Sequence, residues 1–390
     1  MKKNDNDKRY DVTVIGGGLT GKLMISILIK SGIFQKRKLC WINAEKKLVE
    51  DKRVSFINYR NFFKLKKFYG INFLTNDYLK IHKIEIHNTD VSNPISLEDK
   101  IGHGVIIRND IFRNNLKISE NNLKIYKSKV VSTNHDEFHR YLVLENGIKI
   151  NTSLVLSADG NTSPLRQLSN IRYIDHDLDH TIISGYLSTK NFDINTAKQI
   201  FLKDSFIGLL PFSKNLTNFV WSLDNKTLNG KVNFKYYEEI IERLNTYFSK
   251  DDIIFSPPIS ANKELQKYPI NIKYVKHPFN KRLLLIGDAA HSVHPLAGQG
   301  FNLSMEDCFD VIDCIRNAKN IGKDFGEISV LSEYSDKRKT RKNFITLITT
   351  ILFYIFKKKN YYMNKFINIS FKAIETTSFK KLFKILARGY

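Results

Sequence analysis

Asp288 is the residue whose setting points most clearly to chemistry. An apolar run leads directly into this carboxylate, and a turn with Pro295, Gly298 and Gly300 then opens a predicted helix from about Asn302. The pattern predicts a strand that delivers one polar side chain to its carboxyl end, where open α/β sheets bind ligands. The glycines let the backbone pass close to a flat ligand, and the helix directs free N–H groups and its positive dipole end toward it. We therefore expect a slot that tolerates a ring gaining negative charge.

A second candidate site is a glycine-rich turn early in the chain. Residues 10–15 (YDVTVI) predict a short buried strand, and a helical segment follows the turn. Gly16, Gly18 and Gly21 match the GxGxxG spacing in the context that this fingerprint requires, with a strand before and a helix after. Such glycines allow a tight turn, close approach to a pyrophosphate, and packing of the helix on the strand. The turn predicts a dinucleotide site.

Six motifs occur in an order that resembles a known family. They are GGGLTG (16–21), DKRVS (51–55), RNDIFRNNL (108–116), ADGNTSPLR (158–166), LLPF with VWS (209–222) and GDAAHSVHPLAGQGFN (287–302). The chain resembles the class A flavin-dependent aromatic monooxygenases and, within them, the hydroxylases of ubiquinone biosynthesis. The narrower assignment depends on DKRVS, on LLPF with VWS, and on the basic carboxyl-terminal tail.

The resemblance implies an α/β fold, with a Rossmann-like FAD-binding domain, an inserted β-sheet substrate domain and a helical carboxyl-terminal segment. We expect a discontinuous FAD-binding domain, because its last motif returns at 287–302 after an intervening region. Alternating runs such as TNFVWSL predict an antiparallel sheet in that region. The expected boundaries are 1–70, 101–170 and 276–330 for the FAD-binding domain, 71–100 and 171–275 for the substrate domain, and 331–390 for the basic helical region.

The resemblance also implies which residues hold the cofactor. The second strand, residues 38–43, should end at a side chain that binds the ribose. The family usually has Glu at the position of Asn43, and here the nearest Glu is Glu45, so either residue is a candidate. Arg53 and Arg108 match arginines that lie along the cofactor, although either could be a solvated surface residue. Asp159 could lie near the pyrophosphate, or could cap the next helix. The expected set is Gly16, Gly18, Gly21, Asn43, Glu45, Arg53, Arg108, Asp159, Asp288, Pro295, Gly300, Phe301 and Asn302.

The substrate side is expected to be the face of the antiparallel sheet that covers the flavin ring. The candidates for lining it are Leu209, Leu210, Pro211, Phe212 and Trp221, for which ordinary core packing is an equal alternative. No side chain is identified as a general base. The predicted catalytic contribution is the flavin-facing loop with Pro295, Gly298 and Gly300.

The function implied by the resemblance is hydroxylation of the aromatic ring of a polyprenyl phenol or quinol precursor of ubiquinone. FAD would be the cofactor, NAD(P)H the transient reductant and O₂ the oxidant, with a flavin C4a-hydroperoxide as the oxygen donor. The protein would supply orientation, electrostatics and exclusion of water. Three alternatives stay open: a hydroxylase of soluble aromatics, a polyprenyl reductase, and a non-enzymatic member of a quinone-biosynthesis assembly.

Histidines and cysteines do not predict a metal site. His291 and His294 lie three apart, but no Cys or third His accompanies them, and zinc sites normally have three or four ligands. Cys40, Cys308 and Cys314 form no CxxC pair. We expect them to be reduced, buried small hydrophobes, as is typical of a cytoplasmic protein.

Positive charge is concentrated late in the chain. The net charge is +23, and residues 331–390 hold 14 Lys+Arg against 3 Asp+Glu. Phe379, Leu382, Phe383 and Leu386 lie on one side of a predicted basic amphipathic helix, which suits an anionic membrane surface. The apolar run at 345–356 is too short to span a bilayer. The expected location is the inner face of the membrane, in a possible quinone-biosynthesis complex; the alternative is a helical subdomain packed on the protein, and nothing favours nucleic-acid binding.

Overall fold

A parallel sheet is built around the first predicted strand. The computed structural model describes residues 8–44, 51–88, 94–119, 121–202, 205–228, 233–258, 265–294, 298–357 and 387–389. β1 (Lys8–Ile15) lies between β2 and β11 and pairs with both in parallel, as a βαβ unit requires. The strand order is β18-β19-β11-β1-β2-β8, with β10 and β9 added beside β11. The other strands are β2 (Leu39–Ile42), β8 (Lys124–Tyr126), β9 (Val130–His135), β10 (Arg140–Leu144), β11 (Lys149–Ser157), β18 (Phe279–Asn280) and β19 (Leu283–Leu285).

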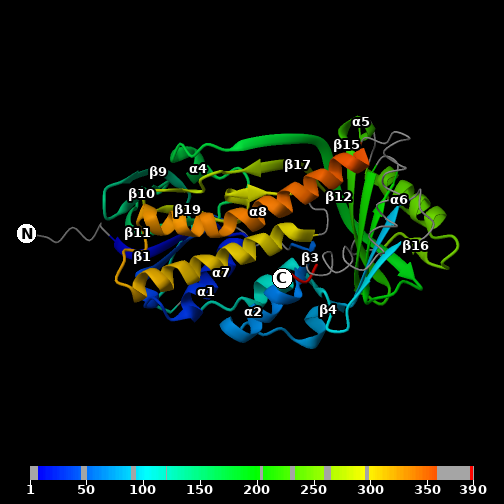
Figure 1. The fold of residues 1–390 in the computed structure, drawn as a ribbon, viewed down its shortest axis with the longest axis horizontal. Helices are drawn as coiled ribbons and strands as arrows, with labels where there is room; N and C mark the ends of the chain where they lie inside the picture. The colour runs from blue at the N-terminus through cyan, green and yellow to red at the C-terminus, as the bar shows by residue number, and fades with distance from the viewer. Residues whose placement is uncertain are drawn as a thin grey trace, which may run out of the picture.

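Helices cover this sheet and bury its apolar face. α1 (Leu19–Ser31) follows β1 and packs against α7 (Gln299–Asn320), while α8 (Ile328–Lys357) packs along α7. Figure 1 shows α8, α7 and α1 running side by side across the sheet. Leu23, Ile27 and Met305 are among the fully buried side chains of the resulting core. Shorter helices are η1 (Lys36–Lys38), α3 (Asn109–Asn115), α4 (Pro164–Leu168) and η4 (Gly287–Ala289).

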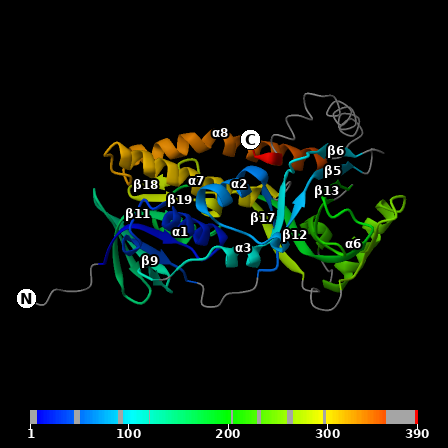
Figure 2. The same cartoon turned by 90° about the horizontal axis from the view of Figure 1, so that it is seen from below.

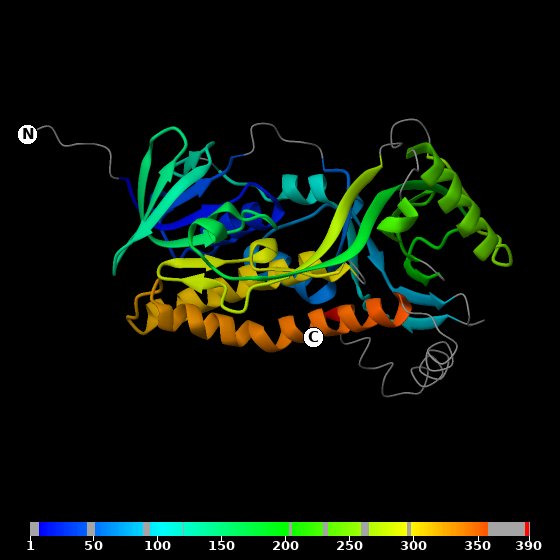
Figure 3. The same ribbon diagram turned by 90° about the horizontal axis from the view of Figure 1, so that it is seen from above.

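The antiparallel sheet expected over residues 71–100 and 171–275 is confirmed, except that Lys83–Asn88 pairs in parallel with Thr196–Phe201 and that the short strand His291–Ser292 joins from outside these ranges. Its strand order is β20-β17-β12-β15-β14-β13-β5-β6, with β16 beside β12. Two long strands, β12 and β17, extend from this sheet toward the first one, as Figure 3 shows from above. The strands are β5 (Lys83–Asn88), β6 (Ile95–Glu98), β12 (Ile174–Lys190), β13 (Thr196–Phe201), β14 (Ser205–Ser213), β15 (Leu216–Asp224), β16 (Ile254–Ser256), β17 (Gln266–Tyr274) and β20 (His291–Ser292). α5 (Asn225–Leu228) and α6 (Asn233–Tyr247) belong to the same region.

A third, three-stranded sheet is formed by strands that alternate in sequence with those of the other two. It has the order β3-β7-β4, with β3 (Val54–Asn58), β4 (Tyr78–Ile81) and β7 (Gly104–Arg108). α2 (Tyr59–Tyr69) follows β3, and η2 (Thr75–Asp77) precedes β4. Ile71 and Phe73, which were assigned to the substrate domain, join the same hydrophobic cluster as Leu23 of α1. The proposed domain boundaries otherwise stay a prediction.

The carboxyl-terminal helix is packed on the protein over most of its described length. Leu331, Tyr334 and Ile345 of α8 are buried, and Figure 2 shows α8 lying along α7. This is the alternative that the sequence left open for the first part of 331–390. Among the helices that the structure describes, none is long and apolar enough to cross a membrane. The amphipathic helix expected at 379–386 lies outside the described residues.

Candidate active site

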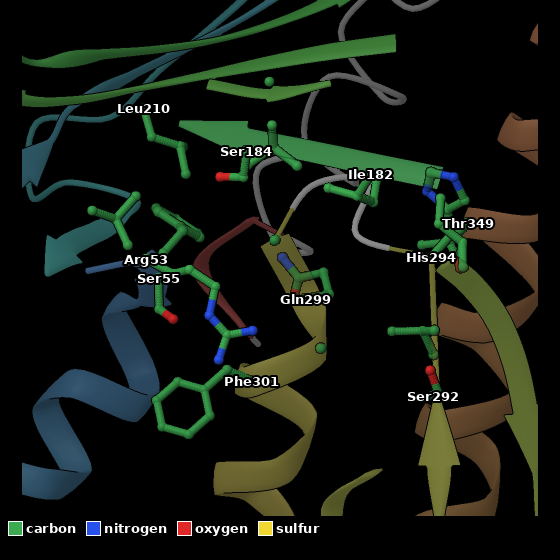
Figure 4. A pocket seen from close by; sticks show the side chains of 18 of the residues that line it. Arg53, Ser55, Ile182, Ser184, Leu210, Ser292, His294, Gln299, Phe301 and Thr349 are labelled. Atoms are coloured by element: carbon green, nitrogen blue, oxygen red, sulfur yellow. The ribbon is translucent and has the colours of Figure 1, made fainter. Parts of the chain in front are cut away.

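One cavity of about 880 Å³ reaches from the parallel sheet to the antiparallel one. Its first part is lined by the two glycine turns, through Gly18 and Gly300, together with Asp288. Its second part lies under the antiparallel sheet, where Ser184 and Leu210 face it (Figure 4). The two sequence motifs that suggested a ligand, almost 270 residues apart, therefore open into the same space.

The glycines of the first turn divide into packing positions and an open position. A Cβ at Gly16 would lie 2.1 Å from the carbonyl oxygen of Ala158, and the φ of Gly16 is +123°. A Cβ at Gly21 would lie 2.2 Å from the oxygen of Gly16, so both positions require backbone contact. A Cβ at Gly18 would meet no atom within 4 Å, because this residue faces the cavity. Gly18 is the N-cap of α1 and supplies no side-chain cap, so the helix offers its free N–H groups to the cavity.

The second turn offers a similar arrangement at α7. The helix begins at Gln299, about three residues before the expected start, because Gly298 adopts a left-handed φ of +60° and forms its N-cap. No side chain caps this end and its first turn holds no acidic residue. Gly298, Gly300 and Phe301 all line the cavity, and Phe301 is held edge-on against Phe112 at 5.2 Å between ring centroids. Pro295 lies outside the described residues.

Asp288 and Arg53 face the cavity from different elements. Asp288 follows β19 in η4, and its carboxylate is accessible from the cavity. The surrounding protein desolvates this carboxyl and raises its pKa, while the charges of His291 and Arg53 act in the opposite direction. Arg53 forms a two-point ion pair with Asp51, with Nε–Oδ1 and Nη2–Oδ2 distances of 2.8 Å. Figure 4 shows its guanidinium inside the cavity near Phe301.

Gly287 explains how the two turns come together. Its φ is +59°, and a Cβ there would lie 2.9 Å from the Thr20 side chain of α1 and 3.1 Å from the Ser304 hydroxyl of α7. Only glycine fits this contact without displacement. The turn that carries Asp288 thus touches α1 and α7 close to their amino-terminal ends, and all three line one cavity. An elongated anionic ligand fits between two uncapped helix amino-terminal ends.

Two other predicted cofactor residues, Arg108 and Asn43, do not line the cavity. Arg108 pairs with Asp110 and lies 5.9 Å from the ring centroid of Phe212, and it does not line the cavity. Asn43 lies at the carboxyl end of β2, where its N–H donates to the oxygen of Tyr126. Its neighbour in the prediction, Glu45, lies outside the described residues, so the ribose-binding residue stays open.

Asp159 and Asn302 have structural partners. Asp159 accepts hydrogen bonds from the hydroxyls of Ser157 and Ser163 and from the N–H of Leu165, which is the helix-capping alternative given above. Its neighbours Ala158, Gly160 and Asn161 line the cavity, but Asp159 does not. Asn302 is fully buried and bonds through its side chain to the backbone of Phe56 and Asn58. Both residues support the cavity wall from behind.

On the substrate side, the two-residue repeat of the strands separates the candidates. Leu210 lines the cavity with Gly208, whereas Leu209 points to the opposite face of β14 and into a hydrophobic cluster under α6. Trp221 of β15 is fully buried in the same cluster, while its neighbours Val220 and Ser222 line the cavity. Leu209 and Trp221 do not line this cavity, and both show the core packing that the sequence left open as the alternative. Pro211 and Phe212 also lie outside its lining.

The sequence did not indicate several cavity residues. From the sheet they include Ile182, Ser184, Phe206 and Ile270, each of which occupies an inward position of a strand. From α8 they are Ile345, Ile348 and Thr349, and the short segment 387–389 adds Ala387. Strand alternation could have identified the first group once Leu210 was placed. Nothing local indicates the second group, because α8 reaches the cavity only through its packing on α7.

A buried charge cluster holds the turn at Asp288 in place. Asp307 of α7 accepts from the N–H of Gly287 at 2.9 Å and lies 2.6 Å from Nε2 of His291. On its other side it accepts from Nε of Arg338, on α8, at 2.9 Å. Burial acts to raise the pKa of Asp307, but His291 and Arg338 hold it below its usual range. The carboxylate is thus ionised and ties both helices to the turn.

The histidines have roles other than metal binding in the described part of the chain. His291 belongs to the charge cluster just defined, and His294 lines the cavity edge-on to Phe206 at 5.9 Å between ring centroids. Burial, with a contribution from His180, lowers the pKa of His294 to about 3, so its ring is neutral. No group of three or more possible metal ligands occurs among these residues. Cys40, Cys308 and Cys314 are unpaired and buried, as expected.

Comparisons with known proteins agree with this geometry. Residues 117–345 match the family described as FAD binding domain. The chain is 27% identical to the ubiquinone biosynthesis monooxygenase COQ6 of Rattus norvegicus, over 90% of this chain and 84% of that protein. It is 30% identical to the ubiquinone hydroxylase UbiM of Neisseria meningitidis, over 54% of this chain and 44% of that one.

Solved structures share the fold at low sequence identity. The p-nitrophenol 4-monooxygenase PnpA of Pseudomonas putida superposes with a TM-score of 0.76 at 16% identity, over 97% of both chains. HpxO of Klebsiella pneumoniae, solved as a variant complexed with FAD, gives a TM-score of 0.74 at 16% identity, over 97% of this chain and 99% of that one. Because the family match covers more than half of its residues, the chain belongs to the FAD-binding monooxygenases.

Proposed function

We propose that this protein hydroxylates the aromatic ring of a polyprenyl phenol or quinol precursor in ubiquinone biosynthesis, with NAD(P)H as reductant and O₂ as oxidant. The observation that carries the proposal is the continuity of the cavity. It joins the cofactor-facing turns to an apolar arm under the antiparallel sheet. Bound FAD supplies the redox chemistry and the oxygen transfer, while the chain binds, orients and excludes water.

The cofactor would be held mainly by backbone. Gly18 and the first turn of α1 would bind the pyrophosphate, and Asp288 would accept hydrogen bonds from the adjoining polyol. The uncapped start of α7 at Gly298 would face the ring edge that gains negative charge on reduction. Arg53, held in place by Asp51, would add a positive charge beside it. These assignments give the pyrophosphate, the polyol and the flavin ring each a partner on the cavity wall.

The apolar arm supports a substrate with an isoprenoid tail. Its wall is formed by the antiparallel sheet and by α8. The apolar residues of this wall are Ile84, Ile86, Ile95, Leu97, Ile182, Phe201, Phe206, Leu210, Val220, Ile270, Ile345 and Ile348. Burial of each methylene in such a wall stabilises a complex by about 0.8 kcal/mol. The neutral His294 ring adds no charge to this arm. A soluble aromatic acid would find no comparable use for so much apolar surface.

Two relatives whose names specify ubiquinone biosynthesis or ubiquinone hydroxylation support the same substrate class. A substrate of this kind resides in membranes. We therefore also propose that the protein acts in the cytoplasm at the inner face of the membrane, in contact with anionic lipid and with other quinone-biosynthesis proteins. The excess of basic residues in 331–390 supports this location.

The proposal is tested with purified protein, NADH or NADPH, O₂ and a detergent-dispersed polyprenyl phenol. A product heavier by one oxygen atom supports hydroxylation, whereas a gain of two hydrogens would identify a reductase. Turnover of short soluble phenols in preference to prenylated ones would refute the substrate class. Asp288→Ala should lose flavin absorbance, while Asp313→Ala, at an exposed carboxylate of α7, should keep it. A protein that binds no flavin and oxidises no nicotinamide would refute the enzymatic role itself.

A further inference from the structure

We propose that the outer face of α2 docks on the surface of an anionic lipid bilayer. The docking surface, hereafter the α2 patch, consists of Phe63, Lys66, Lys67, Phe68 and Leu74. It lies within the stretch of residues 59–74, remote in sequence from the basic tail at 331–390.

The α2 patch exposes large apolar side chains that do not pack in the hydrophobic core. Phe62, Leu65 and Tyr69 already anchor the inner face of α2 in the core. On the outer face, Phe63 is 41% exposed, Phe68 is 65% exposed, and Leu74 in the following loop is 74% exposed. Exposed aromatic groups in one contiguous area mark contact surfaces when they are not isolated.

The aromatic rings of the patch touch one another. Phe63 stacks with Tyr59 at 6.2 Å and meets Phe68 edge-on at 6.4 Å between ring centroids. Lys67 lies over the Phe63 ring, with its Nζ 5.2 Å from the centroid. Aromatic and aliphatic side chains interleaved with lysines are the composition of a helix that lies in a bilayer interface.

Charge favours lipid over a second copy of this chain. α2 (Tyr59–Tyr69) contains four Lys+Arg and no Asp or Glu. A second copy would bring the same positive patch and the same net charge of +23, and like charges brought together in an interface repel. Anionic headgroups provide the opposite charge, and the bilayer interface accepts the rings.

The patch also has a useful position relative to the cavity. Arg60, near the start of α2, donates from Nη1 to the carbonyl oxygen of Gly389 at 3.0 Å. Ala387, in the same short segment, lines the cavity. Figure 1 and Figure 2 both show this segment, marked C, beside α2. If the substrate is membrane-borne, as the proposed function holds, docking by α2 brings this cavity wall toward the lipid.

The test is co-sedimentation of the full-length, FAD-loaded protein with phosphatidylcholine vesicles, with and without phosphatidylglycerol. Binding should require the anionic lipid. Lys66→Gln with Lys67→Gln should weaken it by about fivefold per lysine, and Phe63→Ser with Phe68→Ser should weaken it by at least about tenfold. Matched controls at a distant hairpin, Phe138→Ser (60% exposed) and Lys149→Gln, should bind as the wild type does.

Each outcome decides the proposal. Equal binding by wild type and patch variants, or binding that ignores phosphatidylglycerol, would overturn it. Loss of a dimer in sedimentation velocity for the Phe variants would assign the patch to a second copy instead. Retained binding in the Phe variants, with loss of an acidic protein partner, would also overturn it. Hydroxylation of detergent-dispersed substrate separates this inference from the proposed function, because the patch variants should keep that activity and the flavin spectrum.

Discussion

Removal of Arg338 tests whether the buried charge cluster braces the cofactor turn. Its guanidinium is almost fully buried and contacts four groups on α7. Nε donates to Asp307 at 2.9 Å, Nη1 donates to Glu306 at 2.9 Å and to Asp310 at 3.2 Å, and Nη2 donates to the carbonyl of Leu303 at 3.1 Å. Arg338→Ala deletes all of these contacts and leaves the carboxylates in place.

The three carboxylates differ in the partners that they keep when Arg338 is removed. Glu306 keeps Arg341, and Asp310 keeps Lys337 at 2.8 Å. Asp307 loses its guanidinium partner and stays buried beside His291. Removing one partner of a buried ion pair costs up to about 3–5 kcal/mol when the remaining charge is left uncompensated, a large part of the roughly 5–15 kcal/mol by which proteins are stable. His291 and the N–H of Gly287 still contact Asp307, so we expect the lower end, about 3 kcal/mol.

The pKa of Asp307 determines how the effect of Arg338→Ala on stability should change with pH. The folded-state pKa of Asp307 is held below its ordinary 3.8, so its contribution to stability is present above that value and is lost as the pH falls through the folded pKa. Without Arg338 the pKa of Asp307 rises, because one of the two side chains that oppose its desolvation is removed while His291 remains. The difference in unfolding free energy between wild type and variant should therefore be largest at neutral pH and should shrink in acid.

Urea unfolding at neutral pH and near about pH 4 measures both effects. The matched control is Arg316→Ala, which breaks an exposed pair with Asp313 on α7 and should cost less than about 1 kcal/mol. Flavin retention should also fall in Arg338→Ala, because Asp307 holds the N–H of Gly287 beside Asp288. A cost as small as that of the control, or one that does not change with pH, would refute the bracing role.

Three other substitutions probe separate parts of the cavity. Gly16→Ala places a Cβ 2.1 Å from the oxygen of Ala158, so it should lower stability by at least about 1–3 kcal/mol and reduce flavin absorbance after purification. Arg388→Ala removes a 3.3 Å contact to Asp99 beside Ala387, so KM for a prenylated phenol should rise about fivefold with kcat little changed. Ile348→Trp should fill the apolar arm and raise that KM by about tenfold while flavin content stays normal; unchanged steady-state kinetics would argue against both substrate-side assignments.

The cofactor half of the site could be predicted because its signals are local. A strand, a glycine spacing and a helix lie together in the first motif, and β1 and α1 form where they were expected. α7 begins earlier than the sequence predicted, because a glycine with positive φ can either end a turn or form the N-cap of a helix. Gly298 does the second, which draws Gln299 into the helix. For Asp159 the sequence could not choose between ligand and cap, because both need a carboxylate after a strand.

The substrate half could be predicted only as a region. The LLPF run and Trp221 do lie in the sheet that covers the cavity, but strand alternation sends Leu209 and Trp221 to the far side and leaves Leu210 inward. The register between strands that are distant in sequence decides whether the odd-numbered or the even-numbered residues of a strand face the cavity. The sequence holds no local signal of that register. The same limit applies to Arg108, whose partners Asp110 and Phe212 come together only in the fold.

The carboxyl-terminal helix connects these two halves. One part of α8 places Arg338 against Asp307 and so braces the turn that carries Asp288. About two to three turns farther on, the same helix lines the apolar arm with Ile345 and Ile348. A bulky group in the arm that displaced α8 would therefore also strain the charge cluster, because a helix moves as a rigid body over so short a distance. Tail binding and cofactor geometry are coupled through this element, which the sequence had identified mainly by its charge.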